Sequence, residues 1–544
     1  MTNSSIPIYT QEFNPSSSLS SDRIHELIKT FQDSYGHQPN LIGRAPGRVN
    51  IIGEHIDYCG FSVLPAAVEL DIILMASVDY HPISNSSQSP KQSALPITVC
   101  LSNTNQNYPS HQFSFESPDS IPLCHQGGWV NFVKASLKTV LLNITTPKQI
   151  PQNIQILFDA NLPSCSGLSS SAALTTVSTL IFYYIFNNSG NCSNEPIQKD
   201  KVVRFAIESE RSNGISVGGM DQTASVYGEI GKLLHIEFIP ETKVIPLPFP
   251  KKPSTTFIIS NSLKKSTKLE SSKTQYNLRF IESKIGTRML LRSDELLRLL
   301  SSSSSSSSTK NKYKLKEMDT LKELIDQIQS ENIMKSIDQV LELIEGKVIV
   351  GDENGFTIEQ VMKRLGFDDD DFKAFDDQIT NGLVVEPVDG KFMIYNRLKH
   401  ILSEAKRVYE FNSLISSSSS SSLKEEEEEE EETMMMMIKI GKLMNDSHLS
   451  CDSDYDCSSD ELNQLIQIAI QNGSLGSRLT GAGWGGCCIH LVPDQKVENV
   501  LKSLYQSYYQ IQFPKMDLES FNQICFTTKP SEGACLFLNK EQFI

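Results

Sequence analysis

The sequence GRAPGRVNIIGEHIDYCGFSVLP, residues 43–65, combines the pattern of a buried strand with an unusual concentration of charge. The apolar runs VNII and FSVLP indicate strands that enter a protein core. Arg48 directly precedes the first run, and Glu54, His55 and Asp57 lie between the two runs. An ordinary buried strand does not hold so many, because each such group is costly to bury without a partner. We therefore interpret the stretch as a polar site at the edge of a core.

The composition excludes several classes of function. The 544 residues are 39% hydrophobic and 21% charged, and their formal net charge is −16 at pH 7. This length is sufficient for two or three domains with hydrophobic cores. The acidic balance argues against a nucleic-acid partner, because a surface that neutralises phosphates is basic. Eight consecutive glutamates, residues 425–432, contribute much of this charge, so the remaining chain is only mildly acidic.

The sequence also favours a cytoplasmic location. The first residues do not show a basic segment followed by an apolar one, so we expect no signal peptide. No window approaches the roughly 18 uninterrupted apolar residues of a membrane span. The eleven cysteines contain no CxxC pair, and we expect them to be reduced thiols. Neither a zinc site nor a membrane association is expected.

The order of helix and strand patterns indicates an α+β fold. An amphipathic helix is expected at 21–35, and strands are expected within 41–80 and at 153–160. Helical patterns dominate the middle of the chain, and strand patterns return near residues 487–493. Because strands and helices do not alternate regularly, a doubly wound parallel sheet is not favoured. Tracts of serine, glutamate and methionine interrupt the second half and are expected to be disordered insertions.

The segment LPSCSGLSSSAALTT, residues 162–176, follows a predicted strand and opens a predicted helix. Small residues let backbone N–H groups approach a ligand closely, and a helix N-terminus favours an anion. These features are typical of a phosphate-binding loop, although the GxxxxGK[ST] pattern of a Walker loop does not occur. An ordinary serine-rich helix cap is an equally good interpretation of this segment alone.

Two further glycine-rich segments complete the set of candidate motifs. GISVGGMDQTASVYG, residues 214–228, places Asp221 after a Gly-Gly turn, where it could be a general base or a simple helix cap. GSRLTGAGWGGCCIHLV, residues 476–492, surrounds Trp484 with glycines before a strand. This third motif could be a loop folded over a ligand or a tight turn in a sheet.

Together the segments resemble the three signature motifs of the galacto-, homoserine, mevalonate and phosphomevalonate kinase superfamily. GRVNIIGEHIDYCGFSVLP resembles the signature of its galactokinase branch almost letter for letter. The likeness continues in SNTNQNYP, in NSLKKSTKLESSKTQYNLR and in GKLMNDSHLSCDSDYDCSSDEL, so it covers most of the chain. The nearest likeness is to the fungal galactokinase and N-acetylgalactosamine kinase branch.

The resemblance implies a role for each matching residue. Arg48 and Asp221 are expected to be catalytic, beside the transferred phosphoryl group and the sugar's C1 hydroxyl. The residues expected to bind the sugar are Arg48, Glu54, His55, Asp57, Gly219, Asp221 and Tyr276. The residues expected to bind ATP are Ser166, Gly167, Leu168, Ser169, Ser170, Ser171 and Lys268. Ser171 and Glu210 are expected to hold Mg²⁺, the second from a looser motif.

The resemblance also implies a two-domain small-molecule kinase fold with the active site in the cleft between the domains. The N-terminal domain is expected over residues 1–235 and the C-terminal domain over 236–544. The second domain would carry disordered insertions at about 301–309 and 416–437, and the third motif at 476–492. Cys165 departs from the superfamily, whose loop usually has glycine there, which makes the loop's geometry less predictable.

Three functions compatible with the motifs compete. The first is ATP-dependent phosphorylation of D-galactose at C1, the first committed step of galactose catabolism. The second is an N-acetylgalactosamine kinase with the same mechanism. This alternative is suggested by residues 444–457, MNDSHLSCDSDYDC, which resemble a segment of the N-acetylgalactosamine kinases. The third is a non-catalytic galactose sensor. An active enzyme is predicted because Ser169–Ser171 and Asp221 are intact, and galactose because the retained motifs serve the hexose core. The expected partners are a small sugar and ATP, with no nucleic acid, no membrane and no obligate protein partner.

Overall fold

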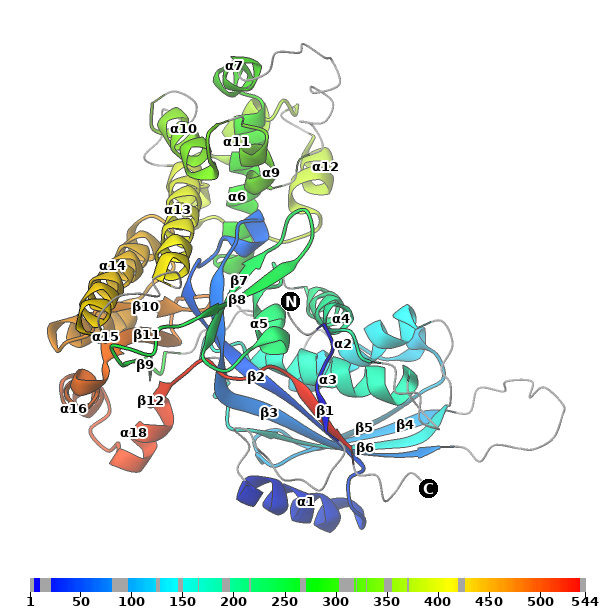
Figure 1. The fold of residues 1–544 in the computed structure, drawn as a ribbon. Coiled ribbons are helices and arrows are strands. Elements are labelled where there is room, and N and C mark those ends of the chain that lie inside the picture. Colours follow the sequence, from blue (N-terminus) through cyan, green and yellow to red (C-terminus); the bar gives the residue numbers. More distant parts are fainter. Residues whose placement is uncertain are drawn as a thin grey trace.

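The computed structural model describes most of the chain. The described residues are 4–9, 21–80, 96–123, 128–144, 150–164, 166–187, 196–214, 217–264, 271–302, 318, 320–328, 330–346, 355–368, 371–418 and 426–538. Two sheet-centred regions adjoin each other, and a helical extension continues from one of them (Figure 1). No helix within these described ranges is long and apolar enough to cross a membrane.

The first region is built on a seven-stranded sheet with the order β1-β13-β2-β3-β6-β4-β5. Its longest strands, β2 and β3, pair antiparallel and carry the two ends of the opening motif. Parallel pairs occur between β1 and β13 and between β4 and β6. The strands are β1 (Ile8–Tyr9), β2 (Leu41–Ile52), β3 (Leu64–Tyr80), β4 (Ile97–Asn103), β5 (His111–Phe115), β6 (Pro151–Ala160) and β13 (Cys535–Leu538).

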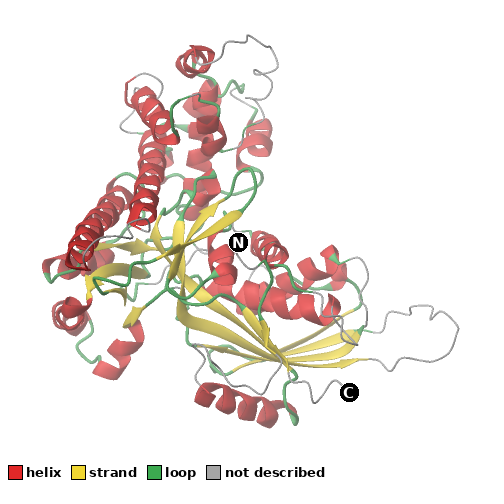
Figure 2. Ribbon diagram, viewed as in Figure 1, coloured by secondary structure: helices red, strands yellow, loops and turns green. Residues whose placement is uncertain are grey.

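Helices cover both faces of this sheet, as Figure 2 shows in red on yellow. One face carries α2 (Gly128–Asn143), α3 (Ser170–Asn187), α4 (Lys199–Arg211) and α5 (Met220–Tyr227). The other face carries the amphipathic helix α1 (Ser21–Tyr35), whose Phe31 is buried against strand residues such as Ile73. The predicted bounds of 21–35 for this helix are confirmed.

The second region contains a four-stranded antiparallel sheet with the order β10-β11-β9-β12. These strands are β9 (Thr255–Asn261), β10 (Gly476–Thr480), β11 (Cys487–Pro493) and β12 (Cys525–Thr528), and a hairpin of β7 (Lys232–Glu237) and β8 (Lys243–Pro248) lies between the regions. The helices are α6 (Tyr276–Leu291), α7 (Asp294–Ser302), α9 (Leu321–Asp326), α10 (Ile333–Gly346), α11 (Ile358–Arg364), α12 (Phe372–Phe375), α13 (Ile394–Ser418), α14 (Glu426–Ser453), α15 (Asp460–Gln471), α16 (Val497–Leu504), α17 (Gln510–Gln512) and α18 (Leu518–Ile524). The predicted α+β fold class is confirmed.

The expectation of disorder over residues 416–437 is wrong where helix α14 forms. Residues 416–437 were expected to be a disordered insertion, but α13 extends to Ser418 and α14 begins at Glu426. The expectation is wrong for the methionines, because Met437 is fully buried and Met436 is 8% exposed. Glutamates are stabilising near a helix N-terminus, and flexible methionines fill irregular gaps in a core. Residues 419–425 lie outside the described residues, as do residues 303–309 of the other expected insertion.

The boundary expected between the domains stays a prediction. Residue 235 falls inside strand β7, which pairs with β8 beyond the boundary. Strand β13 comes from the expected C-terminal domain, yet it pairs with β2 in the first sheet. The chain therefore crosses between the two sheet-centred regions more than once.

Candidate active site

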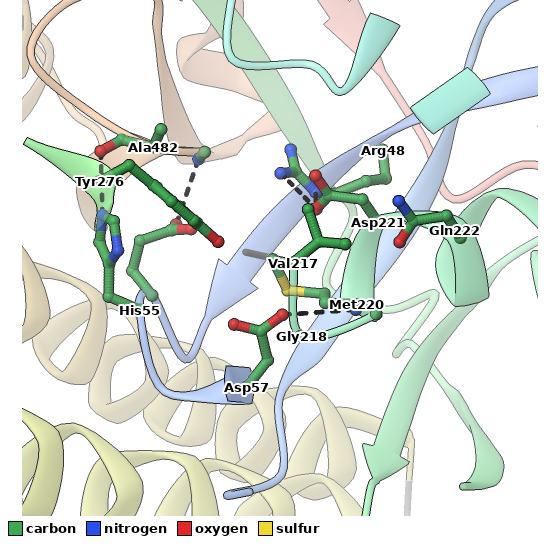
Figure 3. Close-up of a pocket in the computed structure, with 13 residues that line it drawn as sticks. Arg48, His55, Asp57, Val217, Gly218, Met220, Asp221, Gln222, Tyr276 and Ala482 are labelled. Atoms are coloured by element: carbon green, nitrogen blue, oxygen red, sulfur yellow. Dashed lines mark hydrogen bonds and ion pairs between the residues drawn. The ribbon is translucent and has the colours of Figure 1, made fainter. Parts of the chain in front are cut away.

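A pocket at the junction of the two regions gathers residues from three motifs (Figure 3). All seven residues expected to bind a sugar line it. The lining residues are Arg48, Glu54, His55, Asp57, Val217, Gly218, Gly219, Met220, Asp221, Gln222, Tyr276, Gly481 and Ala482. The last two belong to the third motif, whose place in the fold the sequence alone did not indicate.

An ion pair between Arg48 and Asp221 forms one wall of this pocket. Arg48 lies on β2, and Asp221 lies in the first turn of α5, where an acidic side chain is favoured by the helix dipole. Asp221 Oδ1 is 2.7 Å from Arg48 Nε and 2.6 Å from Arg48 Nη2. Both side chains are buried, at 2% and 8% exposure. A carboxylate held in this way can accept or orient the proton of a hydroxyl in the pocket.

Arg48 also connects the pocket to the predicted phosphate loop. Its Nη1 donates to the carbonyl oxygen of Gly167 at 2.7 Å, and its backbone N–H donates to Leu168 at 3.1 Å. The loop runs into the N-terminus of α3 at Ser170, and Gly167 has a φ of 80°. Free N–H groups and the positive end of a helix dipole make this position suited to a phosphate. Lys268 and Cys165 lie outside the described residues.

The third motif packs directly on this loop. A Cβ atom added at Gly481 would lie 2.4 Å from the Gly167 carbonyl oxygen, and one at Gly486 would lie 2.8 Å from that of Ser166. Both distances are far below van der Waals contact, so only glycine allows the two backbones to approach in this way. The glycines of the third motif therefore allow close packing against the predicted phosphate loop.

Ser171 and Glu210, the expected metal ligands, lie in contact. The Ser171 hydroxyl donates to Glu210 Oε1 at 2.7 Å, and the Gln222 amide donates to Oε2 of the same carboxylate. Glu210 is fully buried. A hydroxyl and a carboxylate are oxygen ligands of the kind that Mg²⁺ prefers, together with waters and substrate phosphates. Among the described residues, no group of three or more His, Cys, Asp or Glu could hold a metal by itself.

The opposite wall is formed by the turn after β2. Asp57 accepts a hydrogen bond from the Met220 backbone N–H at 3.4 Å, which ties the turn to α5. His55 Nε2 donates to the Ala482 carbonyl oxygen at 2.9 Å, and the His55 and Tyr276 ring centres are 5.5 Å apart. Burial raises the pKa of Tyr276 well above its ordinary value, so its hydroxyl stays protonated. The wall therefore presents a carboxylate, an imidazole and a hydroxyl to a polar ligand.

Glu54 lies deeper, against the third motif. Its Oε2 accepts from Arg478 Nη2 at 3.1 Å and from the Gly481 backbone N–H at 3.2 Å. Burial raises the pKa of Glu54 to about 7, even though Arg478 and Arg48 favour its charged form. The Glu54 carboxyl therefore connects the turn of residues 53–57, called here the sugar-signature turn, to strand β10, which leads into the third motif.

Several residues around the site were missed by the sequence analysis. Arg478 is fully buried within GSRLT, and Glu404 and His400 on α13 are fully buried beside the turn of residues 53–55. Tyr455 donates to or accepts from Tyr58 at 2.6 Å. The available signal was a pair of titratable side chains, at positions 400 and 404, on the apolar face of a helical pattern and one turn apart.

Comparisons with known proteins agree with this geometry. Three family models match this chain. The model described as "Galactokinase galactose-binding signature" matches residues 29–78. The model described as "GHMP kinases N terminal domain" matches residues 131–229, and the model described as "GHMP kinases C terminal" matches residues 437–510. The chain is 32% identical to the galactokinase of Candida albicans over 96% of both chains. It is 33% identical to the galactokinase of Dictyostelium discoideum over 94% of both.

The chain belongs to the galactokinase family. The galactokinase of Saccharomyces cerevisiae is a further relative, 31% identical over 95% of both chains. The fold matches that of Lactococcus lactis galactokinase complexed with galactose, with a TM-score of 0.61, 20% identity, and coverage of 94% of this chain and 99% of that one. The galactokinase signature contains the whole turn that carries Glu54, His55 and Asp57.

Proposed function

We propose that this protein is a galactokinase, which transfers the γ-phosphoryl group of ATP to the C1 hydroxyl of D-galactose. The observation that carries this proposal is the position of Arg48. Its guanidinium contacts the carboxylate of Asp221 in the polar pocket and the backbone of the loop at the start of α3. A bound sugar hydroxyl and a bound phosphate would therefore meet at this arginine. The relatives named galactokinase support the choice of reaction.

The proposed mechanism depends mainly on positioning and on charge. Arg48 would stabilise the negative charge that spreads over the transferred phosphoryl group. Asp221 would orient the C1 hydroxyl and receive its proton as the oxygen attacks. The buried turn and the third motif would exclude water from the reacting atoms, which limits hydrolysis of ATP.

Glu54, His55, Asp57, Gly219 and Tyr276 are proposed to bind the sugar, and the loop of residues 166–171 is proposed to bind ATP. Ser171 and Glu210 would hold Mg²⁺, which neutralises phosphate charge when bound. Lys268 remains a proposed ATP contact from the sequence alone. A cytoplasmic location and the absence of an obligate protein partner stay predictions.

N-acetylgalactosamine is the second candidate substrate. Its acetamido group replaces the C2 hydroxyl of galactose, so a pocket wall near C2 would decide between the two sugars. We favour galactose because the relatives described above are named galactokinase. The deciding measurement is kcat/KM for galactose and for N-acetylgalactosamine at saturating Mg-ATP. A higher value for N-acetylgalactosamine would overturn the choice of substrate, and no sugar-dependent ADP release would overturn the proposed activity.

We predict that Asp221→Asn removes most turnover but leaves galactose binding measurable. The substitution keeps the shape of the side chain and removes the charge that pairs with Arg48. Loss of a transition-state interaction lowers kcat and kcat/KM together, by about 100-fold or more. Coupled detection of ADP gives the rates, and calorimetric titration with galactose gives the affinity. A kcat close to that of the wild type would contradict the assignment of Asp221.

A further inference from the structure

Two side chains of helix α13, four residues apart, form hydrogen bonds with the backbone of the sugar-signature turn. Glu404 Oε1 accepts from the backbone N–H of Gly53 at 2.8 Å and from that of Glu54 at 3.2 Å. His400 Nε2 donates to the carbonyl oxygen of Glu54 at 3.0 Å. Residues four apart on a helix share a face, so one helix face can reach both sides of a single peptide segment.

The turn that they hold has an unusual backbone. Gly53 has a φ of 108°, and His55 has a φ of 62°, which a residue with a side chain rarely adopts. Consecutive N–H groups in such a turn point to one side and form a small anion-binding concavity. The carboxylate of Glu404 occupies that concavity. A non-glycine residue in this conformation persists only where the surrounding structure fixes it, and such residues gather at binding sites.

The charge of Glu404 is itself secured. Arg407 Nε donates to Oε2 at 2.8 Å, and the Ser447 hydroxyl donates to Oε1 at 2.7 Å. Burial works against the ionised form, but the guanidinium groups of Arg407 and Arg478 outweigh it and hold the pKa of Glu404 below its ordinary value. Burial also lowers the pKa of His400 to about 4, so near pH 7 its neutral ring donates from Nε2 and accepts from Ser450.

We propose that His400 and Glu404 are positioning residues that clamp the turn of residues 53–55 and thereby set the affinity for the sugar. The turn carries Glu54 and His55, both of which line the pocket. The hydrogen bonds described above tie the clamp to this turn and to its own supports, not to the loop at the start of α3. This inference rests on the proposed galactokinase function, and it places a determinant of sugar affinity outside the pocket lining.

The first test compares two substitutions of His400 in the full-length protein. His400→Phe keeps a ring but removes both hydrogen bonds, whereas His400→Gln retains an N–H group for the Glu54 carbonyl. We expect His400→Phe to raise the KM for galactose about 10-fold or more and to leave the KM for ATP within about 2-fold. We expect His400→Gln to recover most of the loss. A merely structural role would move both KM values together or leave the two variants alike, and either result would overturn the clamp.

The second test uses Glu404→Gln with Lys406→Gln as the matched control. Lys406 lies on the same helix and pairs with Asp338 at 2.7 Å, away from the turn. We expect Glu404→Gln to weaken galactose binding in calorimetric titrations without ATP by about 10-fold, and Lys406→Gln to change it less than 2-fold. Equal effects of the two substitutions would contradict the proposal. If Glu404→Gln does not fold, the His400 pair alone decides.

Different outcomes test the proposed function and the role of His400 and Glu404. If the wild-type protein does not phosphorylate galactose, the proposed function fails and the clamp fails with it. If the wild type is active and His400→Phe keeps an unchanged KM for galactose, only the clamp is overturned.

Discussion

Replacing Gly481 by alanine should displace the loop of residues 166–171, which we propose to bind ATP, and slow the reaction. The new Cβ would lie 2.4 Å from the carbonyl oxygen of Gly167 and 2.9 Å from its Cα. Ordinary contacts begin near 3.4 Å, and backbone atoms cannot rotate away as a side-chain end can. One of the two segments must therefore move by about 1 Å, a misplacement that can cost about 100-fold in rate. Because the carbonyl oxygen of Gly167 also accepts a hydrogen bond from Arg48, the shift reaches the Arg48–Asp221 ion pair that we propose to be catalytic.

The matched control is Gly36→Ala. Gly36 has a φ of +83°, close to the +87° of Gly481, but a Cβ there meets nothing within 4 Å. Both substitutions impose the backbone strain of a left-handed alanine, about 1–2 kcal/mol in the free energy of unfolding. Only Gly481→Ala adds the clash, so we expect it to lower kcat/KM for ATP about 100-fold and Gly36→Ala to lower it less than 2-fold. Chemical denaturation measures the change in the free energy of unfolding, and steady-state ADP release measures kcat/KM for ATP. If the two variants had the same kcat/KM, the close approach of the motifs would not matter for catalysis.

Three further outcomes are expected. Glu54→Gln should abolish a pH dependence of the free energy of unfolding. Because the pKa of Glu54 is raised, this free energy falls by up to about 3 kcal/mol as pH rises from about 4.5 to about 7 in the wild type. Denaturation curves of both proteins across that pH range would show whether the dependence disappears. Met437→Ala should lower the free energy of unfolding by about 2–5 kcal/mol because the side chain is fully buried. Met435→Ala should lower it by less than about 0.5 kcal/mol because that side chain is 54% exposed. Equal losses for the two variants in chemical denaturation would refute the packing of α14. Deletion of Ser301–Ser308 should leave kcat/KM nearly unchanged, and a 10-fold loss with the fold intact would show that this tract affects the site.

The sequence allowed the residues of the candidate site and much of the fold to be predicted because their signals are local. The strand pattern around Arg48 and the helix pattern of residues 21–35 each lie within a short window, and each appears in the structure where it was expected. The glycines near Gly481 indicated that some backbone approaches closely. They did not indicate that the approaching backbone is that of Gly167, because this contact joins segments far apart in the chain.

The parts that sequence reasoning missed depend on long-range pairing. Arg478 and Glu404 look like ordinary charged residues of a strand and a helix, and their roles depend on burial beside Glu54. Met437 follows a run of glutamates whose composition is typical of disorder, yet its own side chain packs in the core. Composition averages over a window, whereas burial is decided residue by residue.

The position of β13 has a consequence for the synthesis of this protein. The strand lies between β1 and β2, and nearby Glu532 accepts through its carbonyl oxygen from Arg44, 488 positions earlier. On the ribosome, this edge of β2 therefore remains without its partner until the long stretch of chain between β2 and β13 has been translated. An unpaired edge is a template for pairing with other chains, and nascent domains are most prone to aggregate while such edges are exposed.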